Sequence, residues 1–374
     1  MNILYITNHL NVGGITSYVL TLAKGLKQKG HNIYLASSGG ELLLKFMEAG
    51  IIYIPIPIKT KSEVSPKILA SMFKLSKAIK QNHIDIMHSH SRTTQVLGCL
   101  LKRNTGVAHI STCHGFFKPR LFRKMFPCWR DKVIAISEAV SDHLREDFGV
   151  SEENIRVIHN GIDVDRFKNP CLSGRQENLD IKIELRKNLG LGKGSVVGII
   201  ARLSDVKGHI YLIRAMKTVL EKMPEAQLLI VGEGKMEKQL VNLTKSLNIE
   251  KNVFFVPKIS NTNEVLSIMD LFVMPSLKEG LGLALMEAMA AGVAVIGSEV
   301  GGIKTLIQNG FNGILVKPAD TAGLSCAILD LLSDTAKRQL LSNNARIFIE
   351  QNFSQEKMVS ETEEVYRECL GAEV

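Results

Sequence analysis

Two glutamates, Glu279 and Glu287, lie eight residues apart in a mostly apolar stretch. Residues 282–291 predict a helix of Leu, Ala and Met, which should be buried on most sides and capped by Gly292. A lone carboxylate on such a helix is unfavourable unless a partner hydrogen-bonds to it, so Glu287 requires one. Glu279 precedes the helix N-terminus, where free backbone amides favour an anion. Because carboxylates accept hydrogen bonds from pairs of hydroxyls, the two residues favour a ribose and a hexose as ligands.

Two short apolar segments, residues 271–274 and 293–296, flank this helix and predict buried strands. The loop that carries Glu279 would then lie at the carboxyl edge of a parallel sheet, where doubly wound folds bind their ligands. A purely structural interpretation also stays open, in which Glu279 caps the helix and Glu287 pairs with a distant Lys or Arg.

Arg202 and Lys207 follow another predicted strand, residues 195–201. They place two cations near the carboxyl edge of the same sheet. Fixed charges of this kind can neutralise a pyrophosphate where no metal ion is present. A solvated basic loop is the alternative that the residues alone leave open.

Three histidines, His88, His90 and His114, lie at the ends of two neighbouring predicted strands. Metal ligation is conceivable, but neither their spacing nor a nearby carboxylate cluster forms a zinc signature. Cys113 and His114 make an unfavourable thiol–imidazole dyad, because sequence neighbours at a strand end point in opposite directions.

Gly13 and Gly14 lie in the loop after the first predicted strand, where glycine lets backbone amides approach a phosphate closely. A plain turn is the alternative. Neither this pair nor the later Gly-Glu-Gly at 232–234 forms the dinucleotide-binding fingerprint, which disfavours a nicotinamide oxidoreductase.

Strands and helices alternate along the chain, which predicts parallel, doubly wound α/β sheets. The predicted strands are residues 2–7, 31–36, 51–54, 84–88, 107–112, 132–136, 155–158, 195–201, 227–231, 253–256, 271–274, 293–296 and 313–316. The predicted helices are residues 15–28, 66–81, 211–222, 235–247, 262–269, 282–291, 322–332, 336–351 and 354–370, together with one that starts after Ser137.

The chain has 374 residues, more than a single core usually organises, so we expect two domains. The predicted divisions are a first domain over residues 1–168, a polar linker region over 169–187, a second domain over 188–352 and a C-terminal helix over 353–374. No apolar run approaches the roughly 18 residues that span a bilayer, and the first residues read as a strand instead of a signal peptide. Six scattered cysteines favour a reducing cytoplasm.

The net charge of +9 is concentrated in the first half of the chain. Residues 1–168 hold 23 Lys and Arg against 13 Asp and Glu, a net of +10, which leaves −1 for the rest. Within this half, residues 116–130 interleave aromatic and cationic side chains, among them Phe116, Phe117, Arg120, Arg123 and Lys124. Such a segment could bind an anionic membrane surface or nucleic acid, or simply cover the protein surface as a loop with buried aromatics.

The stretch from Glu279 to Gly292, EGLGLALMEAMAAG, resembles the paired-glutamate signature of retaining glycosyltransferases with the GT-B fold, in the large family GT4 that includes sucrose synthases and mannosyltransferases. The resemblance covers essentially the whole chain and is strongest over residues 195–315. It implies two Rossmann-like doubly wound domains that face each other across a cleft, with the C-terminal helix crossing back to the first domain.

The resemblance also implies roles for particular residues. Arg202 and Lys207 would stabilise the leaving diphosphate, Glu287 would bind the ribose hydroxyls and Glu279 would hold the donor hexose. His114 would contact the donor sugar near the reacting centre, and His90 is a weaker candidate on the acceptor side. The full set of implied donor-binding residues is Gly13, Gly14, Arg202, Lys207, Glu279, Gly280, Leu281, Gly282 and Glu287, and the implied catalytic residues are His114, Arg202, Lys207 and Glu279.

Asp163 and Asp165 superficially form the Asp-x-Asp metal motif of the other glycosyltransferase fold. Their context, VIHNGIDVDRF, instead resembles the stretch that closes the first domain of GT-B enzymes, which implies that no metal or other cofactor is required.

By this resemblance we expect a metal-independent transferase that uses a nucleotide sugar, most simply a UDP-sugar. The acceptor would be a glycan or lipid-linked sugar in cell-surface polysaccharide synthesis, met at the inner face of the cell membrane, where the basic segment would bind anionic lipid. No nucleic acid is expected as a partner. A basic nucleic-acid-binding protein and a GT-B transferase with a small soluble acceptor are the alternatives.

Overall fold

The computed structural model describes residues 1–60, 62–119, 123, 126, 128–129, 131–167, 176–257, 259 and 261–371, with residues 176–179 described by their backbone alone. It divides into two compact units, the first made of Met1–Gly161 with Gln355–Val374 and the second of Ile162–Ser354. No helix among the described residues is long and apolar enough to cross a membrane.

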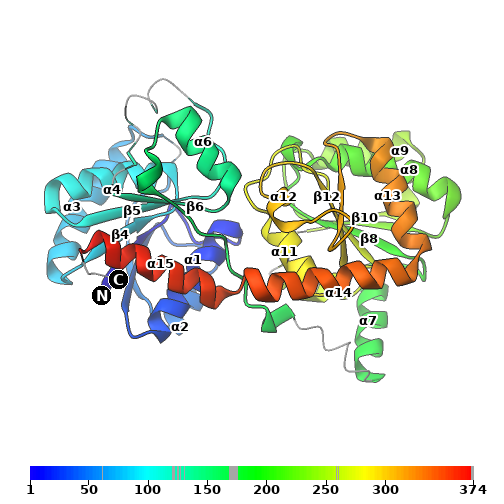
Figure 1. Cartoon of the computed structure of the whole chain (residues 1–374), viewed down its shortest axis with the longest axis horizontal. Helices are drawn as coiled ribbons and strands as arrows, with labels where there is room; N and C mark the ends of the chain where they lie inside the picture. Colours follow the sequence, from blue (N-terminus) through cyan, green and yellow to red (C-terminus); the bar gives the residue numbers. More distant parts are fainter. Residues whose placement is uncertain are drawn as a thin grey trace. The chain divides into compact units, whose positions relative to one another are not determined.

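The first unit is built on a seven-stranded parallel sheet in the order β3-β2-β1-β4-β5-β6-β7 (Figure 1). The strands are β1 (Asn2–Ile6), β2 (Asn32–Ser37), β3 (Ile52–Pro55), β4 (Ile86–Ser89), β5 (Ala108–Cys113), β6 (Lys132–Ala135) and β7 (Ile155–Val157). The described helices are α1 (Gly14–Gln28), α2 (Leu43–Glu48), α3 (Pro66–Gln81), α4 (Arg92–Thr105), α6 (Glu138–Phe148), the 3-10 turn η1 (Glu152–Asn154) and α15 (Gln355–Cys369).

Alternating side chains of β1 supply the core on both faces of this sheet. Ile3 and Tyr5 belong to a fully buried cluster with residues of α1 and α15, whereas Leu4 and Ile6 belong to another with residues of α3 and α4. A strand that is buried on both faces reads as a continuous apolar run, which is how the sequence of β1 appears. The predicted parallel, doubly wound sheet is therefore confirmed.

The second unit is built on a six-stranded parallel sheet in the order β10-β9-β8-β11-β12-β13 (Figure 1). The strands are β8 (Val196–Ile200), β9 (Gln227–Val231), β10 (Val253–Val256), β11 (Leu271–Met274), β12 (Ala294–Ser298) and β13 (Ile314–Val316). The described helices and turns are η2 (Asp165–Phe167), α7 (Gln176–Asn188), η4 (Asp205–Lys207), α8 (His209–Lys222), α9 (Glu237–Ser246), η5 (Glu250–Asn252), α10 (Thr262–Leu266), α11 (Leu283–Ala290), α12 (Ile303–Leu306), α13 (Thr321–Ser333) and α14 (Thr335–Asn352).

The connections between the units differ in detail from the predicted ones. The second unit begins at Ile162, because this residue pairs with Ser354 and its amide donates to the Phe353 carbonyl. The predicted linker region is helical in part, since α7 spans Gln176–Asn188, and the rest of it lies outside the described residues.

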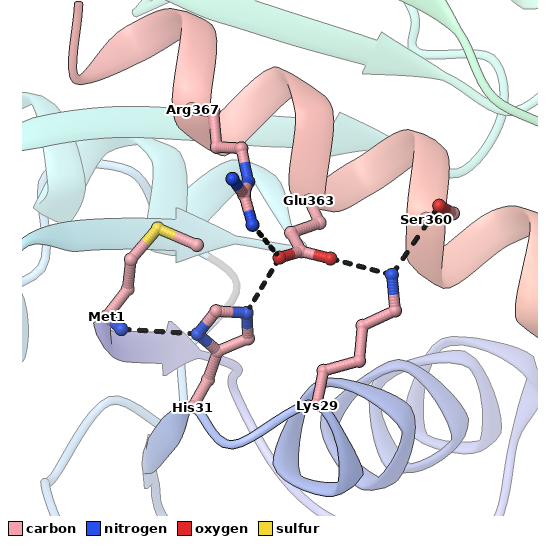
Figure 2. A network of polar contacts seen from close by, with 6 residues as sticks. All are labelled: Met1, Lys29, His31, Ser360, Glu363 and Arg367. Atoms are coloured by element: carbon pink, nitrogen blue, oxygen red, sulfur yellow. Dashed lines mark hydrogen bonds and ion pairs between the residues drawn. The ribbon is translucent and has the colours of Figure 1, made fainter. Parts of the chain in front are cut away.

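The C-terminal helix α15 belongs to the first unit, where it packs against α1. Figure 2 shows the polar network that fastens it there. The Glu363 carboxylate accepts hydrogen bonds from Lys29 Nζ at 2.7 Å, His31 Nε2 at 3.1 Å and Arg367 Nη2 at 2.8 Å. The Met1 ammonium group donates to His31 Nδ1 at 3.2 Å, so the neutral His31 ring carries its proton on Nε2 and donates it to Glu363.

Three donors therefore converge on a carboxylate that is only 7% exposed. Burial alone would raise the pKa of Glu363, but the hydrogen bonds from Arg367, Lys29 and His31 outweigh it and lower the pKa from 4.5 to about 2. A carboxyl whose pKa is lowered by folding stabilises the folded state above its unfolded pKa, and this contribution disappears as the pH falls through the folded pKa.

We expect Glu363→Gln to lower the free energy of unfolding of the first unit by about 2 kcal/mol at pH 7, because a neutral amide cannot balance the charges around it. The difference from wild type should persist down to about pH 4.5 and shrink as the pH approaches 2. Urea denaturation followed by fluorescence of the single tryptophan, Trp129, measures it in this unit. Glu364→Gln is the control, since that neighbouring carboxylate is exposed; equal stability of the two variants would contradict the expectation.

Candidate functional site

Lys207 and Glu279 form an ion pair between two loops of the second unit. Lys207 ends the turn η4 after β8, and Glu279 lies between β11 and α11. The Glu279 carboxylate also accepts a 3.4 Å hydrogen bond from the Ser276 hydroxyl. The two charged side chains are 22% and 12% exposed, so solvent screens their attraction only in part. The structure thus pairs Lys207, which we expected to bind the diphosphate, with Glu279, which we expected to bind the hexose.

Two glycines allow the backbone to pack closely around this pair. Gly208 has a φ of +71°, and a Cβ there would lie 1.8 Å from the Pro275 carbonyl oxygen. A Cβ on Gly302 would lie 2.1 Å from the Gly280 carbonyl oxygen, and the Gly302 amide donates to the Glu279 carbonyl at 3.1 Å. Gly302 was not identified from the sequence, although the doublet that it forms with Gly301 after a buried strand is the same signal that identified Gly13 and Gly14.

Residues 280–282 are buried and lead directly into α11, with Gly282 as its N-cap. The first-turn amides of a helix have no partner within the helix, so this end of α11 favours an anion or a sugar oxygen. This arrangement suits the predicted donor-binding residues Gly280, Leu281 and Gly282.

Arg202 follows β8 by two residues and is exposed. No ion pair of Arg202 is found within the part of the chain that the structure describes. Lys207, five residues later, is held by Glu279, so the two predicted cations have different surroundings. Arg202 has its full hydrogen-bonding capacity available for a ligand.

Glu287 lies on α11, with Thr262 of α10 and Arg166 nearby. Burial raises its pKa, and the Thr262 hydroxyl and the positive charge of Arg166 offset this only in part. The purely structural interpretation of Glu287 required a distant Lys or Arg, and Arg166 is such a residue. Because burial outweighs its effect, Glu287 still gains from a ligand that hydrogen-bonds to the carboxylate.

The Asp-x-Asp sequence does not gather metal ligands in the structure. The Asp163 carboxylate accepts a 3.2 Å hydrogen bond from the Arg166 amide at the start of η2, and Asp163 and Asp165 are both exposed. Among the described residues no group of three or more His, Cys, Asp or Glu side chains is placed to hold a metal ion.

In the first unit the predicted histidines form one aromatic cluster with three tyrosines, Tyr5, Tyr18 and Tyr366. The His88 ring lies between the Tyr366 hydroxyl at 2.6 Å and the Thr112 hydroxyl at 2.7 Å. The His90 and His114 rings are joined by a 3.3 Å contact between Nδ1 of the first and Nε2 of the second. Burial lowers the pKa of His114 to about 3, and those of His88 and His90 also lie well below the ordinary value, so all three rings are neutral near pH 7.

The helix α1 brings Gly13 and Gly14 to the same edge of the sheet as His114. Gly13 is the N-cap of α1, and the ring of Tyr18, one turn further along, lies 4.8 Å from the ring of His114. Both glycines are exposed, and a Cβ on Gly13 would meet nothing within 4 Å. Open space in front of a helix N-terminus suits an anionic ligand.

Cys113 is not a nucleophile in this structure. Burial raises the pKa of its thiol to about 12, and the thiol donates a hydrogen bond to the Gly115 carbonyl at 3.2 Å. A thiol with so high a pKa stays protonated at neutral pH.

The described part of the aromatic and cationic segment is packed against its neighbours, as in the alternative of a surface loop with buried aromatics. Phe116 and Phe117 are half-buried: the Phe116 ring lies 5.3 Å from that of His143 on α6, and the Phe117 amide donates to His143 Nε2 at 2.9 Å. Arg123 donates to Glu63 at 2.6 Å. Arg120 and Lys124 lie outside the described residues. The two phenylalanines are therefore engaged in packing in part, and the membrane role expected for this segment stays a prediction.

Two family profiles match successive halves of the chain. Residues 12–166 match the profile described as Glycosyltransferase Family 4, and residues 181–348 match that described as Glycosyl transferases group 1.

Two curated relatives and one solved structure are similar to this chain. The chain is 28% identical to N-acetyl-alpha-D-glucosaminyl L-malate synthase of Bacillus anthracis over 98% of this chain and 96% of that protein. It is also 28% identical to the UDP-Gal:alpha-D-GlcNAc-diphosphoundecaprenol alpha-1,3-galactosyltransferase of Escherichia coli, over 80% of this chain and 79% of that one. The structure is similar to that of Anabaena HepE in complex with UDP-glucose, with a TM-score of 0.84, 22% identity and coverage of 98% of this chain and 100% of that one. This likeness confirms the predicted fold.

Proposed function

Since the chain belongs to the group 1 glycosyltransferases of the GT-B fold, we propose that it transfers a hexose-type sugar from a UDP-sugar, with retention of the anomeric configuration and without a metal ion. The proposed acceptor is a glycan or lipid-linked sugar at the inner face of the cell membrane, in the synthesis of a cell-surface polysaccharide. The HepE complex with UDP-glucose and the UDP-Gal-dependent Escherichia coli relative support a uridine donor.

The observation that carries the proposal is the ion pair of Lys207 and Glu279, together with the exposed Arg202 in the loop that leads from β8 to Lys207. A donor diphosphate would attract both cations, while the hexose attached to it would offer hydroxyls to Glu279. Binding then exchanges one charged partner of Lys207 for another, so its ammonium group stays paired throughout. Glu287, on the adjoining helix, would accept hydrogen bonds from the ribose hydroxyls of the same donor.

The proposed reaction needs no covalent intermediate. The acceptor hydroxyl attacks the anomeric carbon from the face that the diphosphate leaves, the bond from that carbon to the phosphate oxygen breaks, and the leaving phosphate takes up the hydroxyl proton. Arg202, Lys207 and the amides at the N-terminus of α11 would stabilise the charge that develops on the diphosphate.

A ligand screen tests this function directly. Nucleotide sugars are added singly and the midpoint of thermal unfolding is measured, after which release of the free nucleotide is assayed with the best of them. A UDP-sugar should raise the midpoint most, because a ligand that binds only the folded state stabilises it by mass action. Stabilisation by a GDP- or ADP-sugar alone would exclude the uridine donor, and absence of nucleotide release with every donor and acceptor would exclude the transferase reaction.

The membrane part of the proposal now rests on α3 and the loop before it. The helix α3 carries four exposed lysines, Lys67, Lys74, Lys77 and Lys80, and no acidic residue. Beside them, Leu69 is 52% and Phe73 71% exposed. Apolar side chains that enter a headgroup layer, next to cations that attract anionic lipid, are the two ingredients of peripheral membrane binding.

Salt bridges of Glu63 connect the loop before α3 to the aromatic and cationic segment, residues 116–130. Glu63, just before α3, binds both Arg92 at 3.0 Å and Arg123 at 2.6 Å, and Arg92 also donates to the Phe126 carbonyl. Phe126 is 54% exposed and Val64 76% exposed. Val64 and Phe126 therefore add two exposed apolar side chains to those of Leu69 and Phe73 on α3.

We expect wild-type protein to float with vesicles of phosphatidylglycerol at low salt, and to be released as salt is raised or when neutral lipid replaces the anionic one. The double substitution Leu69→Ser and Phe73→Ser should reduce the bound fraction at least about fivefold, because each exposed side chain contributes roughly 1 kcal/mol or more on insertion. The matched control is Leu340→Ser with Ile347→Ser on α14, which are 60% and 50% exposed. If the wild type stays in the soluble fraction at low salt, the acceptor is better sought among soluble glycans.

A further inference from the structure

We propose that His90 is a positioning residue that holds His114 in the tautomer with its proton on Nδ1, so that His114 offers a hydrogen-bond donor to an oxygen of the bound sugar. The identity of that ligand rests on the proposed function. The tautomer itself follows from the surroundings of the two rings.

His90 is held on every side by the fold of the first unit. It follows β4, is 1% exposed, and its amide donates to the Ile6 carbonyl. Its ring centre lies 4.2 Å from that of His88, 5.4 Å from that of Tyr5 and 5.7 Å from that of Tyr18. A ring packed in this way cannot turn to find other partners.

One nitrogen of this ring has a partner and the other has none. Nδ1 lies 3.3 Å from His114 Nε2, while Nε2 is buried without a hydrogen-bond partner among the residues that the structure describes. His88, by contrast, uses both its nitrogens, on Thr112 and on Tyr366 of α15, so it has none to offer His90.

A neutral imidazole carries one proton, and two arrangements satisfy the contact between the rings. If His114 donated from Nε2, the proton of His90 would have to lie on its own Nε2, as a buried N–H group with no acceptor. If His90 donates from Nδ1, only a lone pair is left without a partner. Orphaned buried N–H groups are rarer than unsatisfied acceptors, so the second arrangement is favoured.

The proton of His114 must then be on its Nδ1, because its Nε2 accepts from His90. Nδ1 of His114 makes no hydrogen bond within the described residues, and unlike Nε2 of His90 it is not closed off from solvent. The half-buried ring therefore presents an N–H group to a ligand at the carboxyl edge of the sheet. A sugar hydroxyl or ring oxygen can accept this bond, whereas a ligand that offers only a donor cannot.

Nitrogen-15 chemical shifts of histidine side chains test the tautomer without any ligand. In protein with labelled histidine, the signals that disappear in a His114→Gln variant are those of His114. We expect its Nδ1 to have the shift of a protonated nitrogen and its Nε2 that of an unprotonated one. The opposite pattern in the wild type would overturn the proposal, whatever reaction the protein performs.

Kinetics of two His90 variants separate positioning from packing. His90→Phe keeps an aromatic ring but cannot donate, and we expect it to lower kcat about fivefold to tenfold with little change in donor KM, the effect of one misplaced neutral hydrogen bond. His90→Asn can place an amide N–H close to the position of Nδ1 and should recover most of the loss. Equal kcat in wild type and His90→Phe would overturn the positioning role, and so would equal losses in the two variants.

His109→Leu serves as the matched control, since it removes another buried histidine of the same sheet, one that bonds Ser89 at 2.8 Å. We expect it to lower the unfolding temperature without changing the protonation of His114. The two proposals also fail in different ways. If no nucleotide sugar is turned over, the proposed function fails, while the chemical shifts of His114 still decide the role of His90.

Discussion

Lys207→Ala and Arg202→Ala are each expected to slow turnover about a hundredfold or more, the scale seen when a single group that stabilises transition-state charge is removed. Both cations follow β8, and in the proposed reaction they face the diphosphate as its charge grows. Their effect should fall on kcat more than on donor KM, because they interact more strongly with the departing diphosphate than with the bound donor.

The ion pair makes the Lys207 variant more informative. Removing the ammonium group leaves the Glu279 carboxylate, which is 12% exposed, with the Ser276 hydroxyl as its remaining hydrogen-bond partner among the described residues. Part of the loss could therefore come from a displaced Glu279. A double-mutant cycle of Lys207→Ala and Glu279→Ala measures this coupling, because the two losses will not add if the residues act through each other.

Lys235→Ala is the matched control for both cations. Its side chain is 77% exposed and its Nζ lies 3.6 Å from the carboxylate of Asp205, and it is not among the residues proposed to contact the diphosphate. Its activity should stay within about twofold of wild type. Activity of the wild type should also survive an excess of EDTA. Complete loss in EDTA, restored by magnesium or manganese, would direct attention back to Asp163 and Asp165.

The sheets could be predicted because their strands are buried on both faces. Continuous apolar runs such as those of β9 and β11 mark such strands and have the bounds that the sequence predicted. The helix α4 was missed because its buried face is largely polar, with Arg92, Thr94 and Gln95 among the residues packed inside. Apolar periodicity cannot reveal a helix of this kind.

The candidate site was predictable residue by residue, but its contacts were not. Glycines and charged residues that follow buried strands lie at the carboxyl edge of a parallel sheet, where such folds bind their ligands. This rule identified Gly13, Arg202, Lys207 and Glu279. The pairing of Lys207 with Glu279 depends on how two loops far apart in sequence approach each other. In the same way, the packing of Phe116 against α6 could not be read from the alternation of aromatic and cationic residues.

Glu287→Ala should weaken donor binding about tenfold to a hundredfold with little change in kcat, whereas Glu279→Ala should mainly lower kcat. The ribose lies away from the reacting carbon, so its hydrogen bonds to a carboxylate bind ground state and transition state alike. Glu279 would hold the hexose, and its loss misplaces the carbon that reacts. Steady-state kinetics with varied donor, together with calorimetric titration of UDP, separate the two effects. Unchanged donor affinity in Glu287→Ala would remove the ribose assignment.

A further variant, Glu287→Gln, connects the site to stability. Burial raises the pKa of Glu287, so above that pKa the ionised side chain destabilises the folded state, and the penalty grows as the pH rises from the unfolded towards the folded pKa. A neutral amide avoids this penalty. We therefore expect Glu287→Gln to unfold at a higher temperature than wild type at pH 7 without ligand, but to gain less from added UDP. A lower unfolding temperature for the variant would mean that the carboxylate is already stabilised within the protein, as the purely structural interpretation requires.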